Sequence, residues 1–180
     1  MCSSDLSAPR ATLGTVRWLA MIAVLHALLG CAACAALLPQ SPPLPAAEFR
    51  AAWIATVDNI DWPSKPGLPS AEAKRELALI VERAAALKLN ALIFQVRPAG
   101  DAFYASPHEP WSEWLTGKQG KAPDTPWDPL QFLTAAAHQQ GIEVHAWFNP
   151  FRARHRAATT PDAPKHITQA MPSGCVRYGE

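Results

Sequence analysis

The stretch GIEVHAWFNPFRAR, residues 141–154, carries the pattern that decides the fold. One set of its side chains is apolar: Ile142, Val144, Ala146 and Phe148. The set that alternates with it is mostly polar: Glu143, His145, Trp147 and Asn149. Such alternation predicts a β-strand whose two faces meet different surroundings. One face thus carries a histidine, a tryptophan and an asparagine, and PFRAR follows instead of a simple turn. These residues indicate that the face has a role beyond contact with solvent.

Two further strands, with a helix between them, are predicted earlier in the chain. FRAAWIATV (residues 49–57) and ALIFQV (residues 91–96) are short β-rich runs and predict strands. Between them we predict a helix with Ser70 as its N-cap and Asn90 as its stop. Its apolar residues recur at helical spacing: Leu77, Ile80, Val81, Ala84 and Leu87.

A second helix is predicted with Asp128 as N-cap, Pro129 at the first helical position and Gly141 as the stop. Its apolar face carries Leu130, Leu133 and Ala137. The order strand, helix, strand, helix, strand is typical of parallel βαβ units. Right-handed crossovers then place both helices on the same side of the sheet.

Two architectures fit this order, a (β/α)8 barrel and a doubly wound sheet. The first strand is not followed by the glycine-rich signature of dinucleotide-binding sheets. The loop over residues 97–127 is far longer than usual, and barrel enzymes keep their sites on loops at the carboxyl ends of strands. The sequence therefore predicts an α/β fold of the TIM type, with about the first three βα units present.

In such a barrel one face of each strand packs on the helices, as expected for Ile142, Val144, Ala146 and Phe148, and the other face points to the interior. The last residues of the inner face reach the barrel mouth. We predict that these side chains bind the substrate there: Gln95, Arg97, His145, Trp147, Asn149 and Arg152. The alternative is that these groups satisfy one another structurally. In the long loop, Trp111 and Trp114 suit either stacking on sugar rings or packing on the rim, and Trp111 is included among the substrate-binding candidates. For Phe103 packing is favoured.

Composition excludes several classes of protein. The chain has 180 residues, 49% of them hydrophobic, which argues against disorder. Its net charge of +1 suggests neither nucleic acid nor an anionic membrane surface as a partner. Cys31 and Cys34 form a C-x-x-C pair without a second pair, so no metal and no cofactor is predicted.

The N-terminal region has the pattern of an export signal. Arg10 and Arg17 precede the apolar run WLAMIAVLHALLG, which is followed by Cys31. We predict a signal peptide over residues 1–31 with a lipoprotein-like ending, lipid on Cys31 and a proline-rich tether over residues 32–47. The chain would then be held at a membrane of the bacterial envelope. Cleavage near Gly30 into a soluble secreted or periplasmic protein, or a signal anchor, are the alternatives.

Three segments closely resemble the bacterial glycosyl-hydrolase-like family ten: RAAWIATVDNIDWPSKPGLP, QVRPAGDAFYASPHEPWSEWLTGKQGK and HAWFNPFR. The resemblance covers residues 49–154 and weakens beyond them, where Met171 and Gly174 replace a histidine and a tryptophan common in the family. It implies a TIM-type barrel that is exported and hydrolyses O-glycosyl bonds of envelope glycan strands of the peptidoglycan type. A carbohydrate-binding barrel without catalysis is the alternative. A metal-dependent hydrolase using His108 and His145 is disfavoured, because no H-x-H pair occurs.

Glycoside hydrolysis usually requires two carboxylates. The resemblance implies that the family's acidic motif lies beyond Glu180, which leaves Asp101 and Asp58, with Asp61, as candidates within the chain. A complete barrel needs roughly 200 or more residues. We therefore expect residues 48–180 to be the first part of the barrel, and we expect this part to be inactive by itself.

Overall fold

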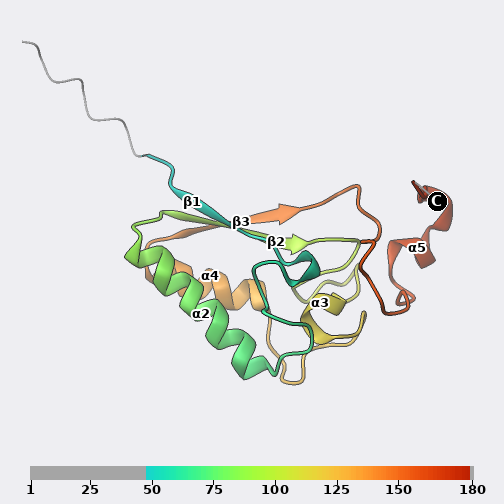
Figure 1. The fold of residues 1–180 in the computed structure, drawn as a ribbon, viewed down its shortest axis with the longest axis horizontal. Coiled ribbons are helices and arrows are strands. Elements are labelled where there is room, and N and C mark those ends of the chain that lie inside the picture. The colour runs from blue at the N-terminus through green and yellow to red at the C-terminus, as the bar shows by residue number, and fades with distance from the viewer. Residues whose placement is uncertain (1–47, 179–180) are drawn as a thin grey trace, which may run out of the picture. The chain divides into compact units, whose positions relative to one another are not determined.

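The computed structural model describes residues 48–178 (Figure 1). The strands are β1 (Ala51–Ile54), β2 (Ala91–Arg97) and β3 (Glu143–Phe148). The longer helices are α2 (Ser70–Ala86) and α4 (Pro129–Gln139). The short helices are η1 (Val57–Asn59), α3 (Glu113–Thr116), α5 (Ile167–Ala170) and η2 (Pro172–Gly174). The predicted signal peptide, tether and lipid site at Cys31 lie outside the described residues.

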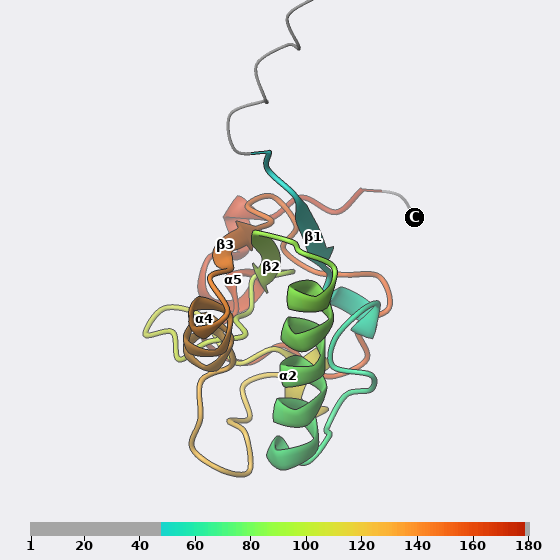
Figure 2. The ribbon, with the colours of Figure 1, turned by 90° about the vertical axis from the view of Figure 1, so that its left-hand side faces the viewer.

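The strands form a parallel sheet in the order β1-β2-β3, as predicted. Trp53, Ile93 and His145 are neighbours across it. Helices α2 and α4 lie together on one side of the sheet (Figures 1 and 2). The core between the layers contains fully buried side chains from both helices and from β2: Leu77, Leu133, Ala137, Leu92, Phe94 and Val96. This is a mixed α/β structure with a small parallel sheet, compatible with part of a TIM barrel.

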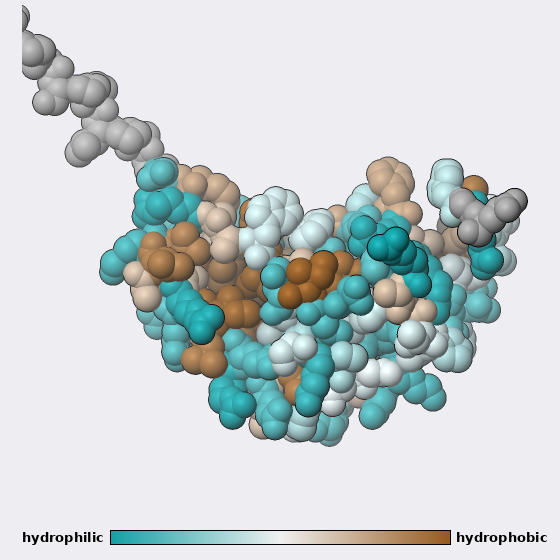
Figure 3. Space-filling model, in the orientation of Figure 1, coloured by the Kyte–Doolittle hydropathy of each residue, from teal (hydrophilic) through white to brown (hydrophobic). Residues whose placement is uncertain are grey.

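The opposite face of the sheet is open within residues 48–178. Trp53 is 61% exposed there, and its ring meets Trp147 edge-on at a centroid distance of 5.0 Å. Phe49 meets His145 in the same way at 5.5 Å. Figure 3 shows strongly hydrophobic groups on its left-hand side, around the carboxyl end of α2 on the helix side of the sheet, and paler groups along the open face. The sheet thus has one packed face and one face with exposed aromatic rings.

The predicted bounds of the first long helix were wrong at both ends. Pro69, not Ser70, is the N-cap, and its carbonyl accepts hydrogen bonds from Glu72 and Ala73 at 2.9 and 3.0 Å. The Ser70 hydroxyl instead bonds to Asp124. The helix ends at Ala86 because Lys88 takes the left-handed conformation, with φ of 59°.

Two further details of this region differ from the sequence prediction. Asn90 does not end the helix but fastens the start of the sheet, since its side chain accepts from Arg50 N at 2.8 Å and donates to Glu48 O at 2.6 Å. Leu87 is 71% exposed and not part of the buried stripe, because it follows the last helical turn.

The second long helix follows the prediction. Asp128 accepts a hydrogen bond from Gln131 N at 3.0 Å, and Pro129 occupies the first helical position. Gly141 takes φ of 70°, where a side chain would be strained, as the chain turns into β3. Of the described helices, none is long and apolar enough to cross a bilayer.

The first and third strands are shorter than predicted. β1 ends at Ile54 because the chain then turns into η1, and Asp61 accepts from Ala55 N at 2.7 Å across this turn. In β3, Ala146 and Phe148 were expected to pack on helices but are exposed. The reason is that no long helix follows β3 within residues 48–178 to cover its carboxyl half.

Candidate functional site

The carboxyl end of β2 joins the ends of β1 and β3. Gln95 is fully buried, and its Oε1 accepts hydrogen bonds from the backbone N–H groups of Thr56 and Val57, both at 3.0 Å. Its Nε2 is buried without a partner among the described residues. Gln95 therefore holds the turn after β1 against β2 and retains one unused donor.

Arg97 makes the corresponding connection to β3. Its Nη1 donates to the backbone oxygen of Asn149 at 2.7 Å, while Asn149 N donates to the backbone oxygen of Arg97 at 2.9 Å. The Nε of Arg97 forms an ion pair with Glu109. Asn149 also accepts from Arg152 N at 3.3 Å through its side-chain oxygen. The structure thus brings together the predicted binding residues Arg97, Asn149 and Arg152, and it adds Glu109.

Glu109 was missed because it lies in the long loop, 12 residues beyond its partner Arg97. No strand or helix period relates the two positions, so their proximity in space could not be inferred from the sequence. The only signal was a carboxylate in a loop expected at the barrel mouth.

The loop after β2 is closed at a narrow neck. Ala102 N donates to Pro110 O at 2.9 Å, and Ser112 N donates to Ala102 O at 3.0 Å. The side chain of Phe103 is fully buried, which confirms the packing role predicted for it. Trp114 is also buried, and Trp111 is half-buried against the core. The loop is therefore a packed unit on the end of the sheet.

Asp101 lies inside this unit and is only 1% exposed. Its carboxylate accepts from Ala99 N at 3.0 Å. Burial raises the pKa of Asp101, although hydrogen bonds from Ser112 and Ala99 and the nearby His166 act to lower it. In this conformation Asp101 is closed off from solvent and braces the loop.

The other candidate carboxylates lie after β1. Asp58 is exposed, in a left-handed conformation with φ of 55°. Asp61 is exposed and accepts from Ala55 N in the turn. Within residues 48–178, no hydrogen bond or ion pair connects Asp58 to the cluster around Arg97.

His145 and Trp147 lie on the open face of the sheet. Trp147 is beside Gln95 in the strand register and stacks edge-on with Trp53. His145 is exposed, and its Nε2 lies 3.0 Å from Oε2 of Glu143. No three His, Cys, Asp or Glu side chains in the described part of the chain gather to hold a metal ion.

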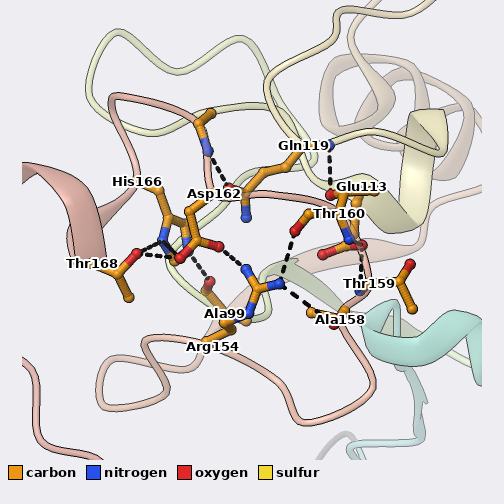
Figure 4. Close-up of polar contacts among 11 residues, drawn as sticks. Ala99, Glu113, Gln119, Arg154, Ala158, Thr159, Thr160, Asp162, His166 and Thr168 are labelled. Atoms are coloured by element: carbon orange, nitrogen blue, oxygen red, sulfur yellow. Dashed lines mark hydrogen bonds and ion pairs between the residues drawn. The ribbon is translucent and has the colours of Figure 1, made fainter.

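The segment after β3 is fastened to the long loop by buried polar contacts (Figure 4). His166 is fully buried, with Nε2 at 2.9 Å from Ala99 O and Nδ1 at 2.7 Å from Thr168 Oγ1. Thr168 donates to Asp162 at 2.5 Å, and Asp162 also pairs with Arg154. These contacts hold residues 154–168 beside the chain that leads from β2 into the loop.

Two side chains of the long loop complete this attachment. Glu113 accepts from the backbone N–H groups of Thr159 and Thr160 at 3.1 and 3.0 Å. Gln119 accepts from Ala163 N at 2.8 Å. Gly100, with φ of 69°, lets the segments approach closely, because a Cβ there would lie 3.0 Å from His166 Nε2.

A separate cavity of about 230 Å³ lies at the amino end of α2. Ser70, Asp124 and Trp127 are among the residues that line it, and none of the predicted site residues does. The hydrogen bond from the Ser70 hydroxyl lowers the pKa of Asp124. This cavity is therefore distinct from the cluster at the ends of β2 and β3.

Comparison with known proteins agrees with the resemblance in the three segments. The family model of glycosyl hydrolase-like 10 matches residues 48–178, beyond the limit at Arg154 expected from the motifs. Glycosyl hydrolase YngK of Bacillus subtilis (strain 168) is 50% identical over 105 residues, which are 58% of this chain and 20% of that protein. Glycosyl hydrolase DigH of Escherichia coli (strain K12) is 39% identical over 111 residues, 58% of this chain and 25% of that protein.

The chain thus spans about a quarter or less of the length of these curated relatives. The matched region contains the whole sheet, both long helices and the cluster around Arg97. The family and the names of the relatives support a general hydrolase role. This chain belongs to the glycosyl hydrolase-like 10 family.

Proposed function

We propose that the protein is an exported glycoside hydrolase that cleaves O-glycosyl bonds in glycan strands of the bacterial envelope, of the peptidoglycan type. Residues 48–178 would form the first three βα units of a (β/α)8 barrel. Family membership, the parallel sheet and the long loop at the carboxyl end of β2 support this proposal. The open face of the sheet would then point into the barrel.

The observation that carries the proposal is the cluster of Arg97, Glu109 and Asn149 at the ends of β2 and β3. A guanidinium, a carboxylate and an amide offer donors and acceptors on one small surface. Sugar hydroxyls both donate and accept hydrogen bonds, so they match such a surface. The carboxyl ends of the strands are also where barrel enzymes hold their substrates.

We also propose attachment to a membrane of the envelope through lipid on Cys31, because of the LLGC ending of the apolar run. A lipid anchor with two or more acyl chains would bind the membrane stably and keep the domain near polymeric glycan. The proline-rich residues 39–47 would act as a stiff spacer between membrane and domain.

A carbohydrate-binding protein without catalysis is the second candidate. The burial of Asp101 favours it, because this carboxylate, one of the catalytic candidates from the sequence, is closed off from solvent. Binding without cleavage would need only the polar cluster and the aromatic rings.

The test is incubation of the whole purified protein with peptidoglycan glycan strands stripped of their peptides. New reducing ends, with products identified by mass spectrometry, are the expected result. Retention of the strands without new reducing ends would favour the binding protein. If the protein neither binds nor cleaves the strands, the proposal is contradicted.

A further inference from the structure

We infer that Glu109 contacts the substrate and that, together with Arg97, it binds two neighbouring hydroxyl groups of one sugar ring. This inference rests on the proposed function and specifies how the site recognises its substrate. It concerns a residue that the sequence did not single out, in an ion pair at the carboxyl end of β2.

The backbone around Glu109 is fixed before any ligand arrives. The neck bonds of Ala102 with Pro110 and Ser112 close the loop immediately after this residue. On the other side, Ser106 Oγ accepts from the backbone N–H groups of His108 and Glu109 at 3.2 and 3.1 Å. A backbone held in this way loses little conformational entropy on binding.

Arg97 fixes the direction of the Glu109 side chain. The guanidinium uses Nε for Glu109 and Nη1 for Asn149 O, so the loop and β3 hold it from two sides. Among residues 48–178, neither Nη2 of Arg97 nor Oε2 of Glu109 has a hydrogen-bond partner. An unused donor and an unused acceptor therefore remain on one rigid pair.

The exposure of the pair suits a binding wall. The side chain of Arg97 is 16% exposed and that of Glu109 is 20% exposed. Both groups are largely shielded from water, which strengthens polar contacts, yet a ligand can still reach them. Glu113 differs, because it is 4% exposed and its carboxylate already accepts from the backbone of Thr159 and Thr160.

The pair matches the chemistry of adjacent sugar hydroxyls. One hydroxyl donates to Oε2 of Glu109, and its neighbour accepts from Nη2 of Arg97. In this arrangement Glu109 accepts a hydrogen bond from the substrate while Arg97 holds its side chain in place.

The test compares binding of peptide-free glycan oligosaccharides to the whole protein and to Glu109→Gln by titration calorimetry. We expect Glu109→Gln to weaken binding about tenfold or more, the scale of a hydrogen bond to a charged group. Glu82→Gln, the same chemical change at an exposed position of α2, is the matched control and should bind like the wild type. Thermal melts of all three proteins accompany the titrations.

A set of deoxy oligosaccharides, each lacking one hydroxyl, separates contact from structural support. One deoxy ligand should bind the wild type about tenfold more weakly, while Glu109→Gln should not distinguish it from the parent sugar. Equal sensitivity of both proteins to every deoxy ligand would overturn the inference. Unchanged affinity in Glu109→Gln would overturn it as well and leave the proposed function intact.

Failure of the wild type to bind or cleave any glycan would overturn both the inference and the proposed function. If Glu109→Gln does not fold, a crystal structure of the wild-type protein with a bound oligosaccharide decides. A sugar oxygen within hydrogen-bond distance of Oε2 of Glu109 supports the inference. A bound sugar that leaves Glu109 without contact contradicts it.

Discussion

Asp101 illustrates at the scale of one residue how burial changes the role of a carboxylate. Its position just after β2 made it a catalytic candidate, but the packed loop closes it off from solvent. Burial raises its pKa because the charged form loses hydration. Between the ordinary pKa of an aspartate and this raised value, the folded protein binds more protons than the unfolded chain. The free energy of unfolding therefore falls as pH rises through that interval.

We predict that Asp101→Asn removes this pH dependence, because an amide has no proton to lose and its oxygen can still accept from Ala99 N. As pH rises above the ordinary pKa of an aspartate, the melting temperature of the wild type should fall relative to that of the variant, and the difference should become constant above the raised pKa of Asp101. Thermal melts across pH provide the measurement. A difference in melting temperature that is the same at every pH would contradict the burial argument.

The individual site residues were only partly predictable from the sequence. Period-2 alternation placed Gln95 and Arg97 on one strand face, and hydrogen bonds just beyond the end of β3 join Arg97 to Asn149. Glu109 was not predictable, because loop conformation follows from tertiary contacts such as the neck at Ala102.

At the scale of elements, a predicted helix or strand agrees with the structure where residues close in sequence determine it. The predicted start of α4 was correct because Asp128 and Pro129 act within one helical turn. The predicted start of α2 was wrong because the Ser70 hydroxyl bonds to Asp124, which is distant in the sequence. Phe148 was misplaced because its burial depends on a covering helix, which the described residues do not include.

The segment after β3 gives a prediction at the same scale. His166→Ala removes buried hydrogen bonds to Ala99 O and Thr168, so residues 154–168 should detach more readily from the long loop. We expect a loss of about 1–3 kcal/mol in the free energy of unfolding, the cost of leaving buried polar groups unpaired. Chemical denaturation measures it, and hydrogen exchange should accelerate first in residues 154–168.

The control for this experiment is His138→Ala, a histidine that is exposed on α4. It should leave both stability and exchange unchanged. Equal effects of the two substitutions would show that the contacts of His166 do not hold the segment.

At the scale of the whole molecule, we propose that an N-terminal lipid anchor holds a glycan-binding domain at a membrane. We predict that Cys31 carries lipid, because a charged region and an apolar run precede it. Cells grown with a fatty-acid probe should label the wild type and Cys34→Ala equally but should not label Cys31→Ala. Labelling of Cys31→Ala at the wild-type level would contradict the lipoprotein interpretation.

The open face of the sheet belongs to the same scale. Its exposed rings, such as Trp53, are the side chains that a complete barrel would enclose. The sequence predicted the direction of this face from alternation alone. In a complete barrel, further strands and helices would cover this face.

We propose that the ends of β2 and β3 form a site that holds a glycan during hydrolysis. Cleavage of peptide-free glycan strands by the whole protein is compared with cleavage by Asn149→Ala, with Gln139→Ala on α4 as an exposed control. We predict that Asn149→Ala lowers kcat/KM by a factor that corresponds to a loss of roughly 1–3 kcal/mol in transition-state stabilisation. Its melting temperature should change little. Unchanged cleavage together with a large fall in melting temperature would mean that Asn149 only supports the fold.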